Sequence, residues 1–455
     1  MAIKINLIKL SILFLFFSFI FTGCKTTKQK ETNIKDSPIP EIQDKTYQEE
    51  IHQDNEIHQE KIYQLEIDLI EGKSNIFIKG VDYGETPVKL DLLEGEYDIK
   101  LIRKNYQDGE CKVILNKNRK IIFRHTKESI SGIKHLGIYR CGEQPKQVVF
   151  SPDDKYIYIP LLEDEGFQVF STESWEITNF IKPDAPKKNY GFTEGVFIKP
   201  KWGNYYSFLV TQMTTSTIYE YRYPDLTFIR KINTEGKWPK YMCYSEDLDY
   251  LAVSNWATNN VVIFNYSSGK VIKNIPTAEA PRGLFFSPDN KYLYIACFDG
   301  GTLVKINTTT WKEEKSIFVQ NSAMRHIVYS LQTEKLFVTN MYHAQVYQVN
   351  PEKFFIEKRY KIYYNPNTTD ITPDGRYIFV SCRGPNDPNT YLVRSPENGK
   401  IAVIDLKNES VISFIAGGNQ PTGLDVSNNG KYLCFSNFRD KNIEIYDIGD
   451  FIGVQ

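Results

Sequence analysis

Two stretches of this chain, Phe150-Ser151-Pro152-Asp153-Asp154-Lys155-Tyr156 and Phe286-Ser287-Pro288-Asp289-Asn290-Lys291-Tyr292, are almost the same heptapeptide. Ser-Pro-Asp is typical of a tight turn, because proline pre-sets φ and the Ser and Asp side chains hydrogen-bond to nearby backbone amides. An apolar run precedes each turn and a second apolar run follows it. The repeated element is therefore predicted to be strand, turn, strand.

Weaker copies of this turn recur along the C-terminal three quarters of the chain, at Ile198-Lys199-Pro200, Tyr244-Ser245-Glu246-Asp247, Tyr329-Ser330-Leu331, Ile371-Thr372-Pro373-Asp374-Gly375 and Val426-Ser427-Asn428-Asn429-Gly430. The second residues of the seven copies stand at 151, 199, 245, 287, 330, 372 and 427, with spacings of 48, 46, 42, 43, 42 and 55. Each unit has a third apolar run after a polar loop, and most have a fourth. Four strands at a period near 45 residues are typical of a β-propeller. The chain is predicted to be all-β, with a seven-bladed propeller over residues 127–455.

The two ends of the repeat region predict how the ring closes. The last unit stops at Ile443–Tyr446, after its third strand, and a surplus strand, Ile133–Tyr139, precedes the first unit. We expect Ile133–Tyr139 to complete the last blade, because this pairing removes two exposed sheet edges at once.

Short motifs inside the units resemble those of the YVTN-type propeller family, which carries P-x-G, S-P-D-G and V-x-N elements. Here Pro281-Arg282-Gly283, Pro421-Thr422-Gly423 and Val253-Ser254-Asn255 match. The resemblance covers about 320 residues and implies the propeller fold. It does not identify an activity, because one superfold hosts many functions.

Alignment of the copies places a set of polar residues at one position near the start of each first strand: Lys146, Glu194, Lys240, Arg282, Arg325, Asn367 and Thr422. Arg383 and Arg439 follow second strands and should lie on the same face, together with the long insertions 184–193 and 384–399. We therefore predict a basic channel mouth, suited to carboxylate, phosphate or sulfate groups. We expect these charges to be exposed and screened by salt. In the alternative interpretation each cation pairs with an acid, such as Glu194, Asp299 or Asp387, and only closes the funnel.

The repeat singles out no catalytic, metal or cofactor residues. Asp370 and Asp425 stand just before two of the turns, where turn capping is a simpler role than metal binding. His326 and His343 lie near one another in the predicted unit, but no nucleophile or paired carboxylate accompanies them. A haem-attachment motif and a zinc-type CxxC pair are both missing from the sequence.

Residues 63–126 change to short β runs punctuated by Gly and Pro. The stretches "GETPVKL" (84–90), "EGEYDIKL" (94–101) and "KNY" (104–106) resemble the PEGA domain, a small β module of bacterial envelope proteins. The family's S-x-P-x-G lead-in is absent, and Gly72-Lys73-Ser74 stands in its place. The resemblance implies an adaptor or spacer domain.

The first 23 residues read as an export signal. Lys4 and Lys9 precede an apolar run that ends at Phe21-Thr22-Gly23, directly before Cys24. The run is too short to span a bilayer, which needs about 20 apolar residues. The pattern resembles the lipobox of bacterial lipoproteins, with Phe21 in place of the usual Leu. It implies cleavage before Cys24, acylation of that cysteine, and a polar tether over residues 24–62.

The composition limits the classes of molecule that the protein is expected to bind. The net charge is −1, and about −3 once Lys4 and Lys9 leave with the signal, so no global field would attract nucleic acid. The six remaining cysteines lie mostly in apolar patterns and are predicted to be free, buried thiols. The sequence thus predicts a lipid-anchored envelope protein, bound to the membrane through Cys24. Its propeller would recognise an envelope protein, an anionic glycan or a small anionic molecule. The alternative is a lactonase-like propeller hydrolase that acts on a small anionic substrate.

Replacement of Cys24 by alanine tests the anchor. The Cys24→Ala chain should leave the membrane fraction or accumulate as unprocessed precursor, because the acylated cysteine is gone. Fractionation with mass spectrometry of the mature N-terminus measures both outcomes. A fully processed Cys24→Ala protein that still sediments with membranes would contradict the anchor.

Overall fold

The structure is a computed structural model that describes residues 61–106, 108–126, 130–184 and 190–453. Residues 1–23, Cys24 and nearly all of the predicted tether lie outside the described residues. Within the described part, no helix is long and apolar enough to cross a membrane. The helical segments there are a short 3-10 turn, η1 (Trp256–Thr258), and a single α-helical turn, α1 (Gly449–Ile452).

The N-terminal part folds as a small β domain, with strands β1 (Ile62–Leu69), β2 (Asn75–Ile78), β3 (Val81–Glu85), β4 (Val88–Leu93), β5 (Gly95–Ile102), β6 (Gly109–Leu115) and β7 (Arg119–Phe123). Strand β1 pairs antiparallel with β4 and parallel with β7, while β2 pairs with β3 and β5 and β5 pairs with β6. Alternate residues such as Leu65, Ile67, Ile99 and Leu101 are fully buried and form its core.

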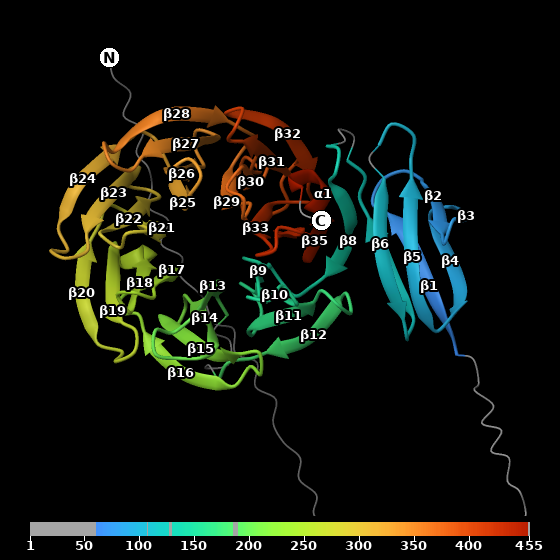
Figure 1. Cartoon of the computed structure of the whole chain (residues 1–455), viewed down its shortest axis with the longest axis horizontal. Helices are drawn as coiled ribbons and strands as arrows, with labels where there is room; N and C mark the ends of the chain where they lie inside the picture. Colours follow the sequence, from blue (N-terminus) through green and yellow to red (C-terminus); the bar gives the residue numbers. More distant parts are fainter. Residues whose placement is uncertain (1–60, 107, 127–129, 185–189, 454–455) are drawn as a thin grey trace, which may run out of the picture. The chain divides into compact units, whose positions relative to one another are not determined.

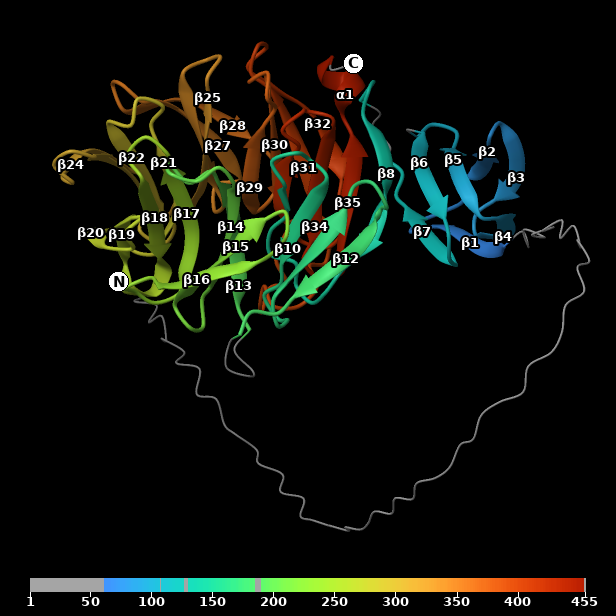
Figure 2. The same ribbon diagram turned by 60° about the horizontal axis from the view of Figure 1, so that its bottom comes forward.

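The described residues between 134 and 447 form a ring of seven sheets around a central axis, which confirms the predicted fold class (Figure 1; Figure 2 shows the ring tilted). Six sheets have four consecutive antiparallel strands, with the first strand of each innermost. Blades 1 to 3 comprise β9 (Val149–Phe150), β10 (Tyr156–Pro160), β11 (Phe167–Ser171), β12 (Glu176–Ile181); β13 (Phe192–Ile198), β14 (Tyr206–Gln212), β15 (Thr217–Tyr223), β16 (Phe228–Asn233); β17 (Pro239–Ser245), β18 (Tyr250–Asn255), β19 (Asn260–Asn265) and β20 (Val271–Pro276).

Blades 4 to 6 comprise β21 (Pro281–Phe286), β22 (Tyr292–Cys297), β23 (Thr302–Asn307), β24 (Glu313–Phe318); β25 (Met324–Ser330), β26 (Lys335–Asn340), β27 (Gln345–Asn350), β28 (Phe355–Lys361); β29 (Pro366–Ile371), β30 (Tyr377–Cys382), β31 (Lys400–Asp405) and β32 (Ser410–Ala416). Blade 7 comprises β33 (Pro421–Val426), β34 (Tyr432–Asn437), β35 (Asn442–Asp447) and, from the other end of the ring, β8 (Lys134–Arg140).

The Ser-Pro-Asp turns are closed by their own side chains. The Ser287 hydroxyl donates to the Asp289 carboxylate at 2.6 Å and accepts the backbone N–H of Tyr292 at 2.9 Å. The same two bonds recur at Ser151, at 2.8 and 3.0 Å. The residue after each Asp, Asp154 or Asn290, has φ near +60°, which Asn and Asp tolerate better than most residues. The repeated heptapeptide thus specifies one turn geometry.

Strand β8 closes the ring and also joins it to the N-terminal domain. It pairs antiparallel with β35, with Ile443 opposite Tyr139, and it also contacts β6 and β7. Leu136 of β8 packs with residues of blades 1 and 7, so the closing strand fills the core between them. The six cysteines of the described residues are free thiols.

A buried ion pair lies beside this closure. Glu444 on β35 is fully buried, and its carboxylate accepts from the Arg124 Nε at 3.1 Å and from the Asn437 side chain at 2.7 Å. His135 of β8 lies 3.5 Å from the same carboxylate. Burial opposes ionisation of Glu444, but Arg124 and His135 nevertheless hold its pKa below the ordinary value. Burial lowers the pKa of His135, so this ring is neutral near neutral pH.

Deletion of β8 should weaken the propeller. A chain that starts at Cys141 lacks β8, the fourth strand of blade 7, and leaves the edge of β35 unpaired. A chain that starts at Ile130 keeps β8 and its pairing with β35. The shorter chain should aggregate, or melt well below the longer one, in a thermal unfolding experiment. Equal melting temperatures would mean that this pairing contributes nothing to stability.

Removal of one partner of the buried pair should be costly. Arg124→Met leaves Glu444 as an uncompensated buried charge, and we expect a loss of about 3–5 kcal/mol in the free energy of unfolding. The folded pKa of Glu444 is lowered. The ionised Glu444 therefore contributes to the free energy of unfolding above about pH 4.3, the pKa of Glu in an unfolded chain. This contribution disappears as the pH falls through the lower pKa of the folded state. Urea unfolding between neutral pH and about pH 3 measures both effects. Arg359→Met, on the exposed outer strand β28, is the matched control.

Candidate functional site

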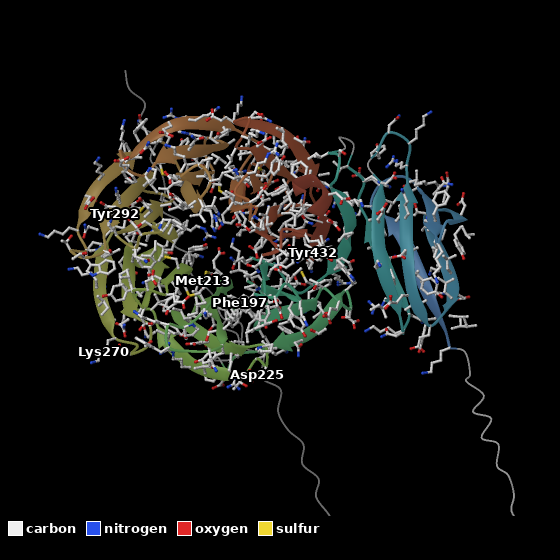
Figure 3. The ribbon with its side chains drawn as sticks, viewed as in Figure 1. Phe197, Met213, Asp225, Lys270, Tyr292 and Tyr432 are labelled. Carbon is white, nitrogen blue, oxygen red and sulfur yellow. The ribbon has the colours of Figure 1, made fainter. Side chains whose placement is uncertain are left out.

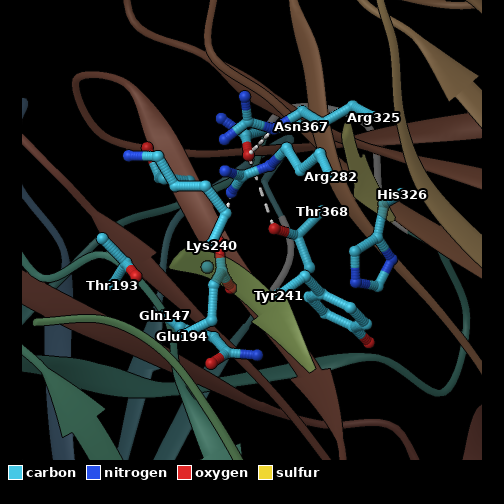
Figure 4. Close-up of polar contacts among 12 residues, drawn as sticks. Gln147, Thr193, Glu194, Lys240, Tyr241, Arg282, Arg325, His326, Asn367 and Thr368 are labelled. Carbon is cyan, nitrogen blue, oxygen red and sulfur yellow. Dashed lines mark hydrogen bonds and ion pairs between the residues drawn. The ribbon is translucent and has the colours of Figure 1, made fainter. Parts of the chain in front are cut away.

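A register shift at the start of the inner strands determines where the cations lie. Strands β17, β21, β25, β29 and β33 each lose regular pairing after their first residue, as between Pro281 and Leu284. Such irregularities re-aim side chains and are common next to functional sites. Here they bring consecutive residues into one cluster at the axis: Lys240 with Tyr241, and Arg325 with His326 (Figure 4).

The turns that lead into four of the inner strands, β17, β21, β29 and β33, share one geometry. The residues just before the prolines, Trp238, Ala280, Asn365 and Gln420, have φ of 58°, 57°, 54° and 60°. Gly283 and Gly423 lie two residues after the prolines, where an added Cβ would meet the backbone of the next inner strand at 2.6 Å and 2.4 Å. The P-x-G motif therefore combines a tight turn, a buried polar side chain at x, and a glycine that lets the next blade's backbone approach closely.

Five of the seven charged residues predicted for the mouth line one cavity of about 320 Å³, which we name the cation cavity: Lys146, Lys240, Arg282, Arg325 and Arg383. They come from blades 1, 3, 4, 5 and 6. The cavity walls also contain five aromatic side chains, Trp238, Trp256, Phe298, Tyr342 and Tyr391. Glu194 and Arg439 are not among the lining residues.

The three arginines are held by polar groups. Arg282 forms an ion pair with Glu194, Arg325 donates from Nε to the Asn367 side chain at 2.6 Å, and Arg383 donates to the Gln420 side chain. Glu194 was one of the three acids considered as a partner, and it neutralises one of the five cations. In the described residues, no carboxylate lies within ion-pair distance of the other four.

The expectation that these charges are exposed is wrong. Arg282, Arg325 and Arg383 are only 4, 5 and 8% exposed. Arg282 and Arg325 lie within the register shifts of β21 and β25, and the guanidinium groups of Arg325 and Arg383 lie 5.9 and 6.0 Å from the ring centres of Phe298 and Tyr391. Arg282 Nε, Arg325 Nη2 and Arg383 Nε are buried and have no hydrogen-bond partner in the structure. Buried donors of this kind are rare in native proteins and require an explanation.

The two lysines lie half-buried against aromatic rings. Lys240 Nζ is 5.8 Å from the centres of Trp238 and Trp256, and 3.1 Å from the Met213 sulfur. Burial, and then the neighbouring Arg282, lowers the pKa of Lys240 to about 7. Burial and the surrounding arginines also lower the pKa of Lys146, whose Nζ is 5.3 Å from the Phe438 ring centre. Burial is the first cause of both shifts, and the like charges of the neighbouring arginines act in the same direction.

Neutral groups come next along the inner strands. His326 packs edge-on against Tyr241 at 5.0 Å, and burial lowers its pKa to about 3, so it is uncharged.

Asp370 and Asp425 neither cap their own turns nor join a metal-binding group in the described residues. Asp425 accepts the backbone N–H of Phe150 at 2.7 Å, and Asp370 accepts that of Val426 at 2.8 Å. Each ties one inner strand to the next.

The aromatic residues and the methionine that line the cavity were not predicted from the sequence. Trp256, Phe298 and Met341 each stand directly after a second strand, at the position equivalent to Arg383. The same alignment that found Arg383 could have found them. Trp238 and Tyr391 come from a turn and from an insertion, and no repeat position points to them.

Comparisons with known proteins agree with the two-part fold. The PEGA domain family matches residues 62–128, and the family "Lactonase, 7-bladed beta-propeller" matches residues 274–453. The second match includes the three arginines of the cation cavity but neither of its lysines. Antigen Lp49 of Leptospira interrogans is 32% identical over 364 residues, which cover 78% of each chain. Because the likeness extends through most of both proteins, this chain belongs to the same family as antigen Lp49.

Proposed function

We propose that this protein is an envelope-located binding protein whose propeller captures an anionic group in the cation cavity. The observation that carries the proposal is the convergence of five cations from five blades on one cavity with a single paired carboxylate. Charged hydrogen bonds from buried guanidinium groups are the strongest that proteins offer to carboxylate, phosphate or sulfate. The ligand is accordingly an acid group on a small molecule, a glycan or an envelope protein.

The location forms part of the proposal. The related Leptospira protein is described as an antigen, which fits an extracellular or envelope protein. The PEGA-like domain fits an adaptor between an anchor and the propeller. We propose that the anchor is lipid on Cys24, as the residues Phe21 to Cys24 imply.

A second candidate is hydrolysis of a small anionic substrate. It is favoured by the lactonase-type match over residues 274–453. Such a reaction needs a proton acceptor at the substrate, and Lys240, with a pKa of about 7, is the lining group suited to that role. Turnover of small lactones that is lost in Lys240→Met would favour this candidate over simple binding.

Loss of two cavity arginines should abolish anion binding. In the Arg325→Gln/Arg383→Gln chain we expect at least a tenfold weaker affinity for inorganic sulfate, because each charged hydrogen bond contributes about 1.5–3 kcal/mol. Titration calorimetry at low ionic strength, with Trp238 and Trp256 fluorescence as a second readout, measures the change. Arg282 is left in place because its removal would strand the buried Glu194.

A matched control removes the same charge elsewhere. Arg359→Gln/Lys270→Gln changes two exposed outer residues, and Lys270 lies on the rim of the ring (Figure 3). This control should bind sulfate as the unmodified protein does. If the cavity variant is folded and binds with unchanged affinity, or if the unmodified protein binds no sulfate, the proposed function is wrong.

A further inference from the structure

The cation cavity contains more positive charge than one simple anion can balance. Of its five cationic side chains, Arg282 alone has a carboxylate partner, so four side chains remain without one in the described residues. Like charges at close range in a partly buried site repel one another strongly. A monoanion would relieve one of these charges and leave the others.

The unsatisfied donors are spread over the cavity. Arg282 Nε, Arg325 Nη2 and Arg383 Nε belong to blades 4, 5 and 6, three successive sectors of the ring. Figure 4 shows the Arg282 and Arg325 guanidinium groups close together, with Lys240 on the near side. A ligand that satisfies all three donors needs acid oxygens that point in more than one direction.

Size and wall chemistry limit the frame that carries those oxygens. A volume of about 320 Å³ is at the small end of ligand pockets, which start near 300 Å³. The rings of Trp238, Trp256 and Phe298 line the cavity together with the cations. They suit a planar apolar frame.

Resting on the proposed function, we propose that the cation cavity binds a small soluble compound with at least two acid groups on a planar frame. We further infer that Lys240 gains a proton when this compound binds. The charged groups that influence Lys240 are Arg282 on β21, Arg325 on β25 and Glu194 on β13, and Lys240 in turn helps to lower the pKa of Lys146 ahead of β9. Only Glu194 is acidic, so an arriving dianion changes the balance in favour of the ammonium form.

The pKa of about 7 makes this proton measurable. At about pH 8 Lys240 is mostly neutral, and a bound dianion that raises its pKa must draw a proton from the buffer. At about pH 6 Lys240 is already charged, so little uptake should occur and binding should be tighter.

Benzene-1,3-disulfonate and benzenesulfonate are the probes for the experiment. They share one planar ring and differ by one charge, and neither titrates near neutral pH, so any proton exchange belongs to the protein. Calorimetry of the full-length chain in two buffers of different ionisation enthalpy gives affinity and proton uptake together. Lys240→Met is the test variant, and Lys270→Met, on the outer rim, is the matched control.

We expect the disulfonate to bind at least tenfold more tightly than the monosulfonate. At about pH 8 the protein should take up about half a proton or more for each disulfonate that binds. Lys240→Met should lose that uptake, and Lys270→Met should keep it.

Three results would overturn the inference. Equal affinities for the two sulfonates would remove the requirement for two acid groups, while anion binding itself would stand. Unchanged proton uptake in Lys240→Met would assign the proton to another group. Displacement of the disulfonate by vesicles of phosphatidylglycerol, but not by phosphatidylcholine, would make the ligand a lipid headgroup. Failure of both sulfonates to bind would instead count against the proposed function.

Discussion

The pairing of β8 with β35 is the constraint on which the propeller depends. Seven sheets can surround one axis only if the last blade is as wide as the others, and the final repeat supplies three strands. The missing strand comes from the N-terminal side of the ring, and Leu136 on it fills the core between blades 1 and 7. Because the ring is closed, the starts of all seven inner strands meet around one axis. The cavity exists as a result of that convergence.

Convergence also creates the electrostatic problem at the axis. Cations brought together from five blades repel one another, and burial removes the water that would screen them. Glu194 offsets part of this repulsion, and Asn367 and Gln420 bond to two of the arginines. The remaining repulsion is reflected in the lowered pKa of Lys240 and Lys146. A cluster of like charges reduces the stability of the fold, and local costs of this kind are typical of functional sites.

The sequence predicted the fold class well, because its signals are local. The Ser-Pro-Asp turns are closed by bonds within five residues, as between Ser287 and Tyr292, so the heptapeptide alone indicates the turn. The repeat position also identified four side chains that line the cavity, and the position after a second strand identified a fifth, Arg383. Their depth was not predictable, since it depends on register shifts such as that between Pro281 and Leu284, which leave no mark in composition or period. The roles of Asp370 and Asp425 were missed for a related reason: their backbone partners lie in the neighbouring blade, 56 and 275 residues away.

The P-x-G motif, with its register shift, also allows different side chains to stand at position x. Proline and glycine fix the backbone on either side of x, while the side chain at x is buried and, in Arg282, forms an ion pair with Glu194 of blade 2. Position x holds Arg in blade 4 and Thr in blade 7 on inner strands of equal length. The same backbone frame therefore accepts a long charged side chain in one blade and a short uncharged one in another. Differences in ligand preference can arise at such a position without a change in the propeller, provided that a buried partner such as Glu194 changes with it.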